Sequence, residues 1–292
     1  MERIRSLRNQ TADARSFLRI VRALSNLAAD PSCHLGLVIY LKKPMISTQY
    51  VSQLRLRRET IASFDGYPFN LPAVRTLDQL ELHPKMTILV GENGSGKSTL
   101  LEAIAVSLGF NPEGGTKNFN FDTRPSHSIL HEFISLAKGI RRPKDGFFFR
   151  AESFFNVATE IENLDRESGG PPLINAYGGQ SLHEQSHGES FLSLIMNRFG
   201  GHGIYILDEP EAALSPQRQL AVLSRMHDLV LNDSQFILAT HSPILMAYPD
   251  AWIYTCAESG WSRVAYQETE HFIVMRDFLA NPDRMLEILC GH

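Results

Sequence analysis

The chain has 292 residues, of which 43% are hydrophobic and 21% are charged, a balance that is ordinary for a folded globular protein and argues against disorder as its dominant state. The formal net charge at neutral pH is −4, so the whole chain is not an obvious polyanion binder, although a local basic patch is compatible with that value. No apolar run approaches the roughly 20 residues of a membrane-spanning helix. Three cysteines without metal-ligand spacing favour free thiols in a reducing compartment, which we expect to be the cytoplasm.

The first segment is basic and amphipathic. Residues 1–30 carry six arginines, and Phe17, Val21, Leu24 and Ala28 fall at helical spacing. We expect residues 1–44 to form a helical extension of a single domain that spans 45–292. Such a helix can bind a membrane surface or nucleic acid, or it can pack against the domain with its arginines in solvent, the commoner situation for a charged helix face.

The clearest motif is a glycine-rich loop between a strand pattern and a helix pattern. The apolar run 86–90 predicts a buried parallel strand, and it leads directly into Gly-Glu-Asn-Gly-Ser-Gly-Lys-Ser-Thr at 91–99. A helix pattern follows and stops at Gly109. This arrangement matches G-x-x-x-x-G-K-[ST] in the strand–loop–helix context that a phosphate-binding loop requires.

Each residue type in this loop suits phosphate chemistry. Glycines let successive backbone N–H groups point inward at phosphate oxygens, and the helix N-terminus adds its positive dipole end. We expect Lys97 to reach the β- and γ-phosphates and the Ser98 hydroxyl to ligate Mg²⁺. The residues expected to hold the nucleotide here are Asn93, Gly94, Ser95, Gly96, Lys97, Ser98 and Thr99.

A carboxylate pair follows the second buried-strand pattern, 203–207. Asp208 and Glu209 should lie beside the loop, because ligands bind at the carboxyl ends of parallel strands. We expect Asp208 to hold Mg²⁺ and Glu209 to polarise the attacking water as a general base. The alternative, that the pair caps the next helix, is disfavoured because Ser215-Pro216 already has the form of that helix's N-cap and first residue.

A third strand pattern, 235–240, ends at His241. A lone histidine is usually structural. At the tip of a strand beside two phosphate-site strands, however, an imidazole could hydrogen-bond the γ-phosphate and report which nucleotide is bound.

Together these motifs resemble those of ABC-type P-loop ATPases, in the branch of structural-maintenance, double-strand-break-repair and RecF-like ATPases, which includes compact bacterial members. The resemblance extends from about residue 50 to about residue 254. In it, Gly91–Thr99 matches Walker A, Ile204–Glu209 matches Walker B, Ala212–Ser215 occupies the place of the D-loop, and His241 matches the switch histidine. It implies ATP and Mg²⁺ as cofactors and catalytic roles for Glu209, His241 and Lys97.

The resemblance also implies a fold. It is an α/β P-loop NTPase with a mainly parallel central sheet, an antiparallel N-terminal β-subdomain and a small helical subdomain inserted at roughly 111–200. The family's signature motif should lie shortly before Walker B, where this chain has Gln-Ser-His-Gly-Glu at 185–189. By resemblance, Ser186, Gly188 and Glu189 would contact the γ-phosphate of ATP held by a second copy, which implies an ATP-dependent head-to-tail homodimer. An ordinary helix cap is the alternative interpretation.

Two family features are weaker here. Where the family places a glutamine after a strand, residues 146–155 offer Glu152 as the best polar candidate, a carboxylate that could hold Mg²⁺ or its water. For the adenine contact, Phe64, Tyr67 and Phe69 precede the loop, and each is equally well explained as a core residue.

Several rival interpretations remain. His183–His187 matches the H-E-x-x-H zinc motif, but flanking glycines indicate a loop rather than the helix that zinc chemistry needs. The function we expect is ATP hydrolysis coupled to a nucleic-acid or protein partner, and the rivals are a transporter-energising subunit, a P-loop kinase and a nucleotide-gated DNA-binding module. The departure from the transporter signature L-S-G-G-Q and the missing glutamine disfavour the transporter. The candidate phosphate contacts of a DNA-binding module are Arg55, Arg57, Arg58, Arg141, Arg142 and Lys144.

Overall fold

The computed structural model describes residues 49–117, 128–167 and 172–291, all within the compact unit Ile46–His292. The expected basic helix of the N-terminal extension lies outside the described residues. Among the described residues, no helix has both the length and the apolar character required to cross a membrane.

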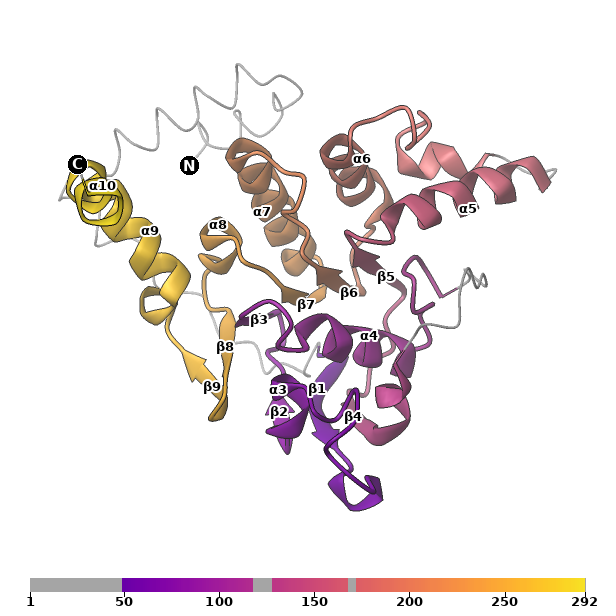
Figure 1. Ribbon diagram of the computed structural model, residues 1–292. Coiled ribbons are helices and arrows are strands. Elements are labelled where there is room, and N and C mark those ends of the chain that lie inside the picture. Colours follow the sequence, from indigo (N-terminus) through magenta and orange to yellow (C-terminus); the bar gives the residue numbers. More distant parts are fainter. Residues whose placement is uncertain (1–48, 118–127, 168–171, 292) are drawn as a thin grey trace, which may run out of the picture. The chain divides into compact units, whose positions relative to one another are not determined.

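A six-stranded sheet forms the centre of the unit (Figure 1). Five strands are parallel and the last is antiparallel, as the sequence predicts for a mainly parallel sheet. In spatial order they are β5 (Asp145–Arg150), β6 (Gly203–Asp208), β7 (Gln235–Ala239), β3 (Met86–Gly91), β8 (Trp252–Ala257) and β9 (Gly260–Val264). Strand β7 therefore separates the Walker A strand β3 from the Walker B strand β6, and the carboxyl ends of all three lie at one edge.

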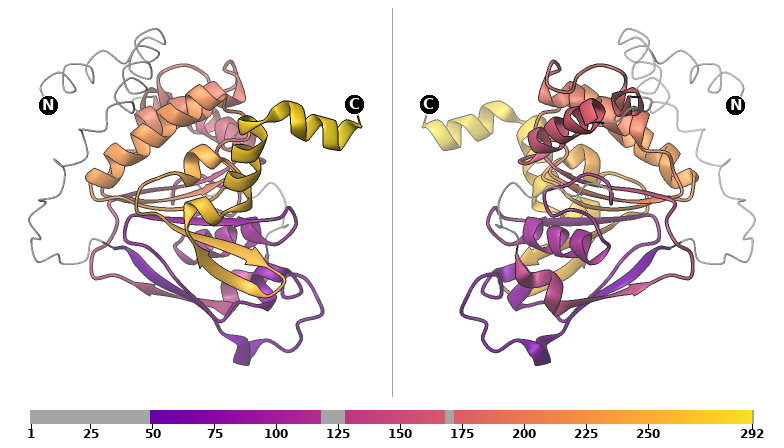
Figure 2. Two further views of the ribbon diagram at one scale, coloured as in Figure 1. Left: turned by 90° about the vertical axis from the view of Figure 1, so that its left-hand side faces the viewer. Right: turned by 90° about the vertical axis from the view of Figure 1, so that its right-hand side faces the viewer.

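One face of this sheet is covered by helix α4 (Lys97–Ser107) and, beyond it, by a small antiparallel sheet (Figure 2). That sheet has the order β2 (Gln79–Glu81), β1 (Val51–Leu56) and β4 (Ile134–Lys138), and it is the expected antiparallel β-subdomain. A single apolar cluster joins the three layers through Leu54 of β1, Leu101 of α4 and Ile206 of β6. Three short helical elements complete this face, namely η2 (Arg58–Thr60), α3 (Pro72–Arg75) and η3 (Ile129–Phe133).

The opposite face carries the longer helices and a second apolar cluster. The helices are α5 (Phe154–Glu167), η4 (Leu173–Tyr177), α6 (His187–Ser193), the π-helical segment η5 (Leu194–Arg198), α7 (Pro216–Leu231) and α8 (Pro243–Met246). Within the expected subdomain at roughly 111–200, α5, η4, α6 and η5 lie on this face, η3 lies on the other face, and β4 and β5 belong to the two sheets. The chain continues through η6 (Tyr266–Glu268) into α9 (Glu270–Ala280) and α10 (Pro282–Cys290).

Two polar side chains, one buried and one partly exposed, fix how these layers meet. Gln235, fully buried at the start of β7, accepts hydrogen bonds from the N–H groups of Tyr50 and Val51, both at 3.0 Å, and donates to the carbonyls of Val51 and His83. It therefore anchors the small sheet to the central one. Asp145, at the start of β5, accepts from Arg198 at 2.8 Å and from the Tyr205 hydroxyl at 2.7 Å, which fastens the end of the helical segment to the sheet.

Candidate active site

The glycine-rich loop connects β3 to α4 and is shaped by left-handed glycines. Gly94 has φ 78° and Gly96 has φ 100°, conformations that only glycine adopts without cost. A side chain on Gly96 would also press against Leu71, because an added Cβ would lie 3.0 Å from that residue's Cβ. The Ala73 N–H donates to the Ser95 carbonyl at 2.8 Å. These contacts hold the loop closed around the N-terminus of α4, where backbone N–H groups are free of helical partners.

Lys97 lies folded into this loop. Its ammonium donates to the carbonyls of Gly91 at 2.7 Å and Glu92 at 2.8 Å, and only 4% of the residue is exposed. Burial lowers the pKa of Lys97, while the nearby Glu209 and Asp208 carboxylates act in the opposite direction. A phosphate oxygen is a stronger acceptor for an ammonium than a neutral carbonyl, so an entering polyphosphate can take over these bonds.

Ser98 and Asp208 form the pair of oxygens that sequence analysis assigns to Mg²⁺. The Ser98 hydroxyl donates to a carboxylate oxygen of Asp208 at 3.0 Å. Burial raises the pKa of Asp208 to about 6, although Arg150 and Ser98 counteract the shift. A hydroxyl and a carboxylate fit a hard cation that keeps several waters. Across the residues that the structure describes, no cluster of three His, Cys, Asp or Glu is placed to hold a metal, so phosphate and water oxygens would complete the shell.

The backbone conformation of Glu209 sets the direction of its side chain. It has φ 49°, an uncommon left-handed conformation for a residue with a side chain, and its N–H donates to the Ala239 carbonyl of β7 at 3.0 Å. One carboxylate oxygen lies 3.7 Å from Nε2 of His241. The structure thus brings the expected general base and the expected switch histidine together at the carboxyl ends of the neighbouring strands β6 and β7.

His241 is held by residues that sequence analysis did not identify. Its backbone N–H donates to Glu211 at 2.5 Å, and its ring Nδ1 lies 3.1 Å from Nε2 of His271, the second residue of α9. Burial is the main cause of the lowered pKa of His241, Lys97 adds to it, and Glu209 opposes it. No sequence pattern indicates these partners, because they lie 30 positions away on separate elements.

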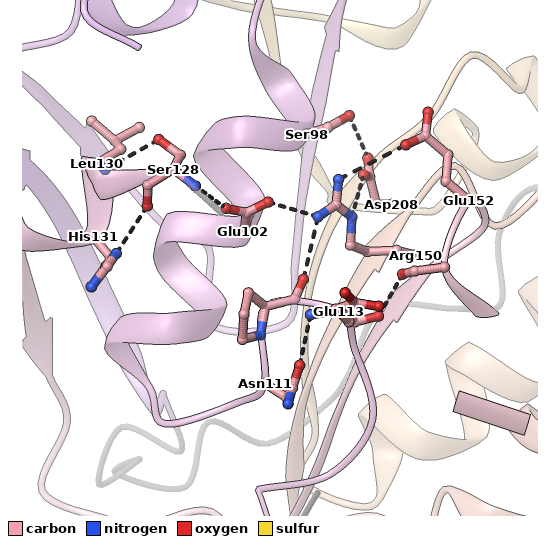
Figure 3. A network of polar contacts seen from close by, with 12 residues as sticks. Ser98, Glu102, Asn111, Glu113, Ser128, Leu130, His131, Arg150, Glu152 and Asp208 are labelled. Atoms are coloured by element: carbon pink, nitrogen blue, oxygen red, sulfur yellow. Dashed lines mark hydrogen bonds and ion pairs between the residues drawn. The ribbon is translucent and has the colours of Figure 1, made fainter. Parts of the chain in front are cut away.

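The group next to Asp208 on β5 is an arginine. Arg150 pairs in register with Asp208 and forms a 2.6 Å ion pair with Glu102 of α4 (Figure 3). Glu152, the candidate for the missing glutamine, has a side chain 90% exposed, and its carboxylate lies 3.9 Å from the same guanidinium. The structure therefore places Ser98 and Asp208 together, while Glu152 is linked to them through Arg150.

The signature segment forms an exposed helix N-terminus. Ser186 is the N-cap of α6: its hydroxyl oxygen accepts the Glu189 N–H at 3.4 Å, and the Glu189 carboxylate accepts the Ser186 N–H at 3.1 Å, which makes a capping box. Glu189 also pairs with Arg218 of α7 at 2.9 Å. Hydrogen bonds from the Ser186 hydroxyl and backbone, followed by one from Arg218, lower the pKa of Glu189 to about 2. Glu189 thus supports the end of the helix that carries Ser186.

Gly188 joins this helix to the segment after Walker B. An added Cβ would collide with the backbone carbonyl of Ala213, so only glycine fits. Ala212 and Ala213 are exposed, and Ser215 caps α7 with Pro216 at its first position, as the sequence predicts. An apolar cavity of about 270 Å³ lies beside this junction, lined by Phe149, Ala151, Phe154, Gly188, Phe191, Glu209, Pro210, Ala212, Ala213 and Leu214.

The three aromatic candidates for the adenine contact differ in how far they are exposed. Phe69 is buried against Phe133, with ring centroids 4.9 Å apart, and Phe64 packs on Phe69, whereas Tyr67 is 63% exposed. Tyr67 is therefore the adenine candidate whose ring is available. In the H-E-x-x-H segment, Nε2 of His183 lies 3.1 Å from the Thr159 hydroxyl.

Several candidate DNA contacts are occupied within the chain. Arg58 pairs with Asp78 and lies over the Phe64 ring, and Arg141 pairs with Asp233 at 3.6 Å. These pairings reduce the positive charge available to a nucleic acid on these two arginines.

Two family models match the chain. The model described as an AAA domain matches residues 60–165, and the model described as an AAA domain, putative AbiEii toxin, type IV TA system, matches residues 176–247. Together the matched ranges contain the glycine-rich loop, the signature segment, the carboxylate pair and His241.

Three curated relatives give more detail. The cytochrome c biogenesis ATP-binding export protein CcmA of Rhizobium johnstonii is 30% identical over 171 residues, which are 54% of this chain and 75% of that protein. The DNA repair protein RecN of Vibrio cholerae is 29% identical over 150 residues, 46% of this chain and 26% of RecN. The ABC transporter G family member STR2 of Medicago truncatula is 27% identical over 176 residues, 54% of this chain and 24% of STR2. The chain therefore spans about a quarter of the length of RecN and STR2.

Among solved structures, cbiO1 from Clostridium perfringens, part of the ABC transporter complex cbiONQ, aligns with a TM-score of 0.47 and 18% identity. The alignment covers 82% of this chain and 99% of that one.

Proposed function

The chain belongs to the ABC-type P-loop ATPases, and from this premise we propose that it hydrolyses ATP through head-to-tail pairing of two copies and uses that cycle to act on a nucleic-acid or protein partner. The family and the α/β fold are shared with its relatives.

Within one copy, the loop 93–99 and the N-terminus of α4 would cradle the triphosphate. Lys97 would exchange the carbonyls of Gly91 and Glu92 for β- and γ-phosphate oxygens. Ser98 and Asp208 would hold Mg²⁺, which when bound neutralises phosphate charge. Glu209 would accept a proton from the attacking water, and His241 would donate a hydrogen bond to the γ-phosphate.

The head-to-tail pairing is supported by the position of helix α6. Its N-terminus is exposed at Ser186, and Gly188 seats it on the exposed Ala212–Ala213 segment that follows Glu209. Among the described residues, the side-chain hydrogen bonds of Ser186 are all to Glu189 of its own turn. An N-terminus of this kind is suited to a phosphate that arrives from outside the chain, and a second copy would supply one.

The test is complementation between two inactive variants. Lys97→Ala removes the ammonium from the loop, and Gly188→Ala displaces α6 through the collision with Ala213. In a head-to-tail dimer, a mixed pair contains one site with both an intact loop and an intact signature helix. An equal mixture should therefore regain about a quarter of the wild-type rate, from random pairing.

The control for this mixture is Gly66→Ala, because an added Cβ at Gly66 meets nothing within 4 Å. This variant should remain active by itself. If the mixture stays as inactive as each variant alone, while Lys97→Ala and Gly188→Ala both remain folded, the shared-site proposal is wrong.

Two departures from the family pattern near the site favour one class of partner. By resemblance, Glu152 stands where the family has a glutamine, and Ser-His-Gly-Glu at 186–189 departs from the transporter signature, so we favour a repair-type partner over a membrane permease. RecN is named a DNA repair protein, whereas CcmA and STR2 are named as an export protein and a transporter, so the transporter subunit is the second candidate.

An ATPase assay with and without duplex DNA separates these partners. Stimulation by DNA that weakens with rising salt supports a nucleic-acid partner. Co-purification with a membrane permease, together with no response to DNA, supports the transporter subunit. The proposal also places the chain in the cytoplasm, where the free thiols of Cys256 and Cys290 would stay reduced.

A further inference from the structure

His271, on helix α9, reaches the candidate site. It follows the N-cap Thr269 by two positions, and its Nε2 lies 3.1 Å from Nδ1 of His241. The ring centroids are 5.3 Å apart. On the far side of His241, the buried Nε2 finds no hydrogen-bond partner among the described residues and lies 3.7 Å from a carboxylate oxygen of Glu209. The three side chains thus form a row that begins on α9 and ends at the expected general base.

Two imidazole nitrogens at hydrogen-bond distance share one proton, so the two rings must adopt complementary tautomers. If His241 carried its proton on Nδ1, the lone pair of its Nε2 would face the Glu209 carboxylate, which is repulsive. In the opposite arrangement, His271 donates from Nε2, and His241 keeps its own proton on Nε2, directed at Glu209. Electrostatics therefore favours the second arrangement.

The charges around the pair are consistent with two neutral rings. Burial is the main cause of the lowered pKa of both His241 and His271, and Lys97 adds to each. Glu209 acts in the opposite direction on His241, and Glu270 and Glu211 do so on His271. Both rings are then neutral: His271 donates its Nε2–H to His241, and His241 carries its own proton on Nε2.

We propose that His271 is a positioning residue for ATP hydrolysis: it holds His241 in the tautomer that presents Nε2–H to the γ-phosphate. This inference rests on the proposed role of His241 as the γ-phosphate contact. It assigns α9 a task that the family motifs do not include, because it makes the C-terminal helix part of the hydrolysis site. Displacement of α9 by a partner would release the ring of His241 and slow turnover without touching the nucleotide.

The test compares two replacements of His271. Gln places an N–H near the position of Nε2 and can still donate to His241, whereas Leu has similar bulk and cannot. We expect His271→Gln to keep kcat within about threefold of wild type and His271→Leu to lower kcat by about 10- to 100-fold, the range typical of groups that orient a functional ligand. The affinity for ATP should change little in either variant, because the side chain at position 271 does not contact the glycine-rich loop.

The matched control is Phe272→Leu, which loosens the packing of α9 on Tyr266 without touching His241. A purely structural role for α9 would lower activity in this control as well. Equal losses in the Gln and Leu variants, or full activity in His271→Leu, would overturn the inference.

A second readout is independent of turnover. Nitrogen-15 NMR of the imidazoles, assigned with His241→Ala, should show His241 protonated on Nε2 in the nucleotide-free wild type and a mixture of tautomers in His271→Leu. An unchanged tautomer in that variant counts against the inference. If His241→Ala is itself fully active, the role proposed for His241 fails, and the NMR result still decides whether His271 orients the ring.

Discussion

Arg150 and Glu102 form an ion pair at 2.6 Å directly beneath the Ser98–Asp208 contact. Ser98 and Glu102 are four residues apart and share one face of α4, while Asp208 and Arg150 are in register on β6 and β5. Two polar pairs therefore connect the Walker A helix to the two neighbouring strands. The glycine-rich loop and the carboxylate turn are held at a fixed separation by this arrangement before any nucleotide arrives.

We predict that Arg150→Met lowers the free energy of unfolding by about 3–5 kcal/mol, because Glu102 is left as a buried charge without its partner. Urea unfolding followed by circular dichroism measures this change. The double variant Arg150→Met with Glu102→Gln should recover part of the loss, since the amide is neutral and still accepts the Ser128 N–H that Glu102 binds at 2.8 Å. A loss below about 1 kcal/mol in the single variant would show that the ion pair contributes little to holding α4 against the strands β5 and β6.

Lys97→Ala should weaken ATP binding by about 10- to 100-fold, the loss expected for hydrogen bonds to a charged group. Isothermal titration calorimetry provides the measurement. Lys85→Ala is the matched control, because Lys85 precedes the same strand at its opposite end and should leave affinity unchanged. Equal affinity in Lys97→Ala and the control would remove the loop from the nucleotide site.

Glu209→Gln should lower kcat by about 10²- to 10⁴-fold, the usual contribution of general-base catalysis, while ATP still binds. Because hydrolysis would no longer separate the two copies, we expect the variant to run as a dimer on size-exclusion chromatography with ATP and Mg²⁺. Wild type with ADP should run as a monomer. A variant that remains monomeric at saturating ATP would contradict the hydrolysis-driven cycle.

Asp145→Asn should destabilise the fold in a pH-dependent way. Burial works to raise the pKa of Asp145, but hydrogen bonds from Gly200, Arg198 and Tyr205 outweigh it and bring the pKa below 3.8. A lowered pKa in the folded state contributes stability that is fully present above the unfolded-state value and is lost as pH falls through the folded-state value. The variant should therefore lose about 1.5–3 kcal/mol at neutral pH.

The check for Asp145 is a series of urea unfolding curves from neutral pH down to about pH 3. The difference in the free energy of unfolding between wild type and Asp145→Asn should narrow only at the acid end, below the ordinary pKa of 3.8. Tyr205→Phe, which removes one of the hydrogen bonds to Asp145, should give a smaller loss with the same pH dependence. A gap that stays constant with pH would mean that the aspartate charge does not contribute.

Local pattern was sufficient for much of the fold. The strands that carry the motifs occur at Met86–Gly91, Gly203–Asp208 and Gln235–Ala239, and Ser215-Pro216 caps α7, because burial periodicity and capping chemistry act within a few residues. The order of strands is not encoded locally, and the position of β7 between β3 and β6 appears only in the structure.

The site residues that the sequence does not reveal are those whose role depends on partners far away in the chain. Arg150 lies 48 positions from Glu102, and His271 lies 30 positions from His241. Their residue types match ordinary surface positions in the sequence, so no spacing rule identifies them. For the same reason the sequence predicts Glu152 rather than Arg150 beside Asp208, since residue spacing does not show which of the two side chains faces that carboxylate.

The left-handed backbone of Glu209 places two opposed evolutionary pressures on one position. Glycine would relieve a conformational penalty of about 1 kcal/mol or more, but it has no carboxylate. A library of variants screened for thermal tolerance alone should drift away from glutamate at this codon, whereas a library screened for turnover should retain it. Statistical consensus taken from relatives that have lost hydrolysis would therefore be a poor guide to the catalytic sequence.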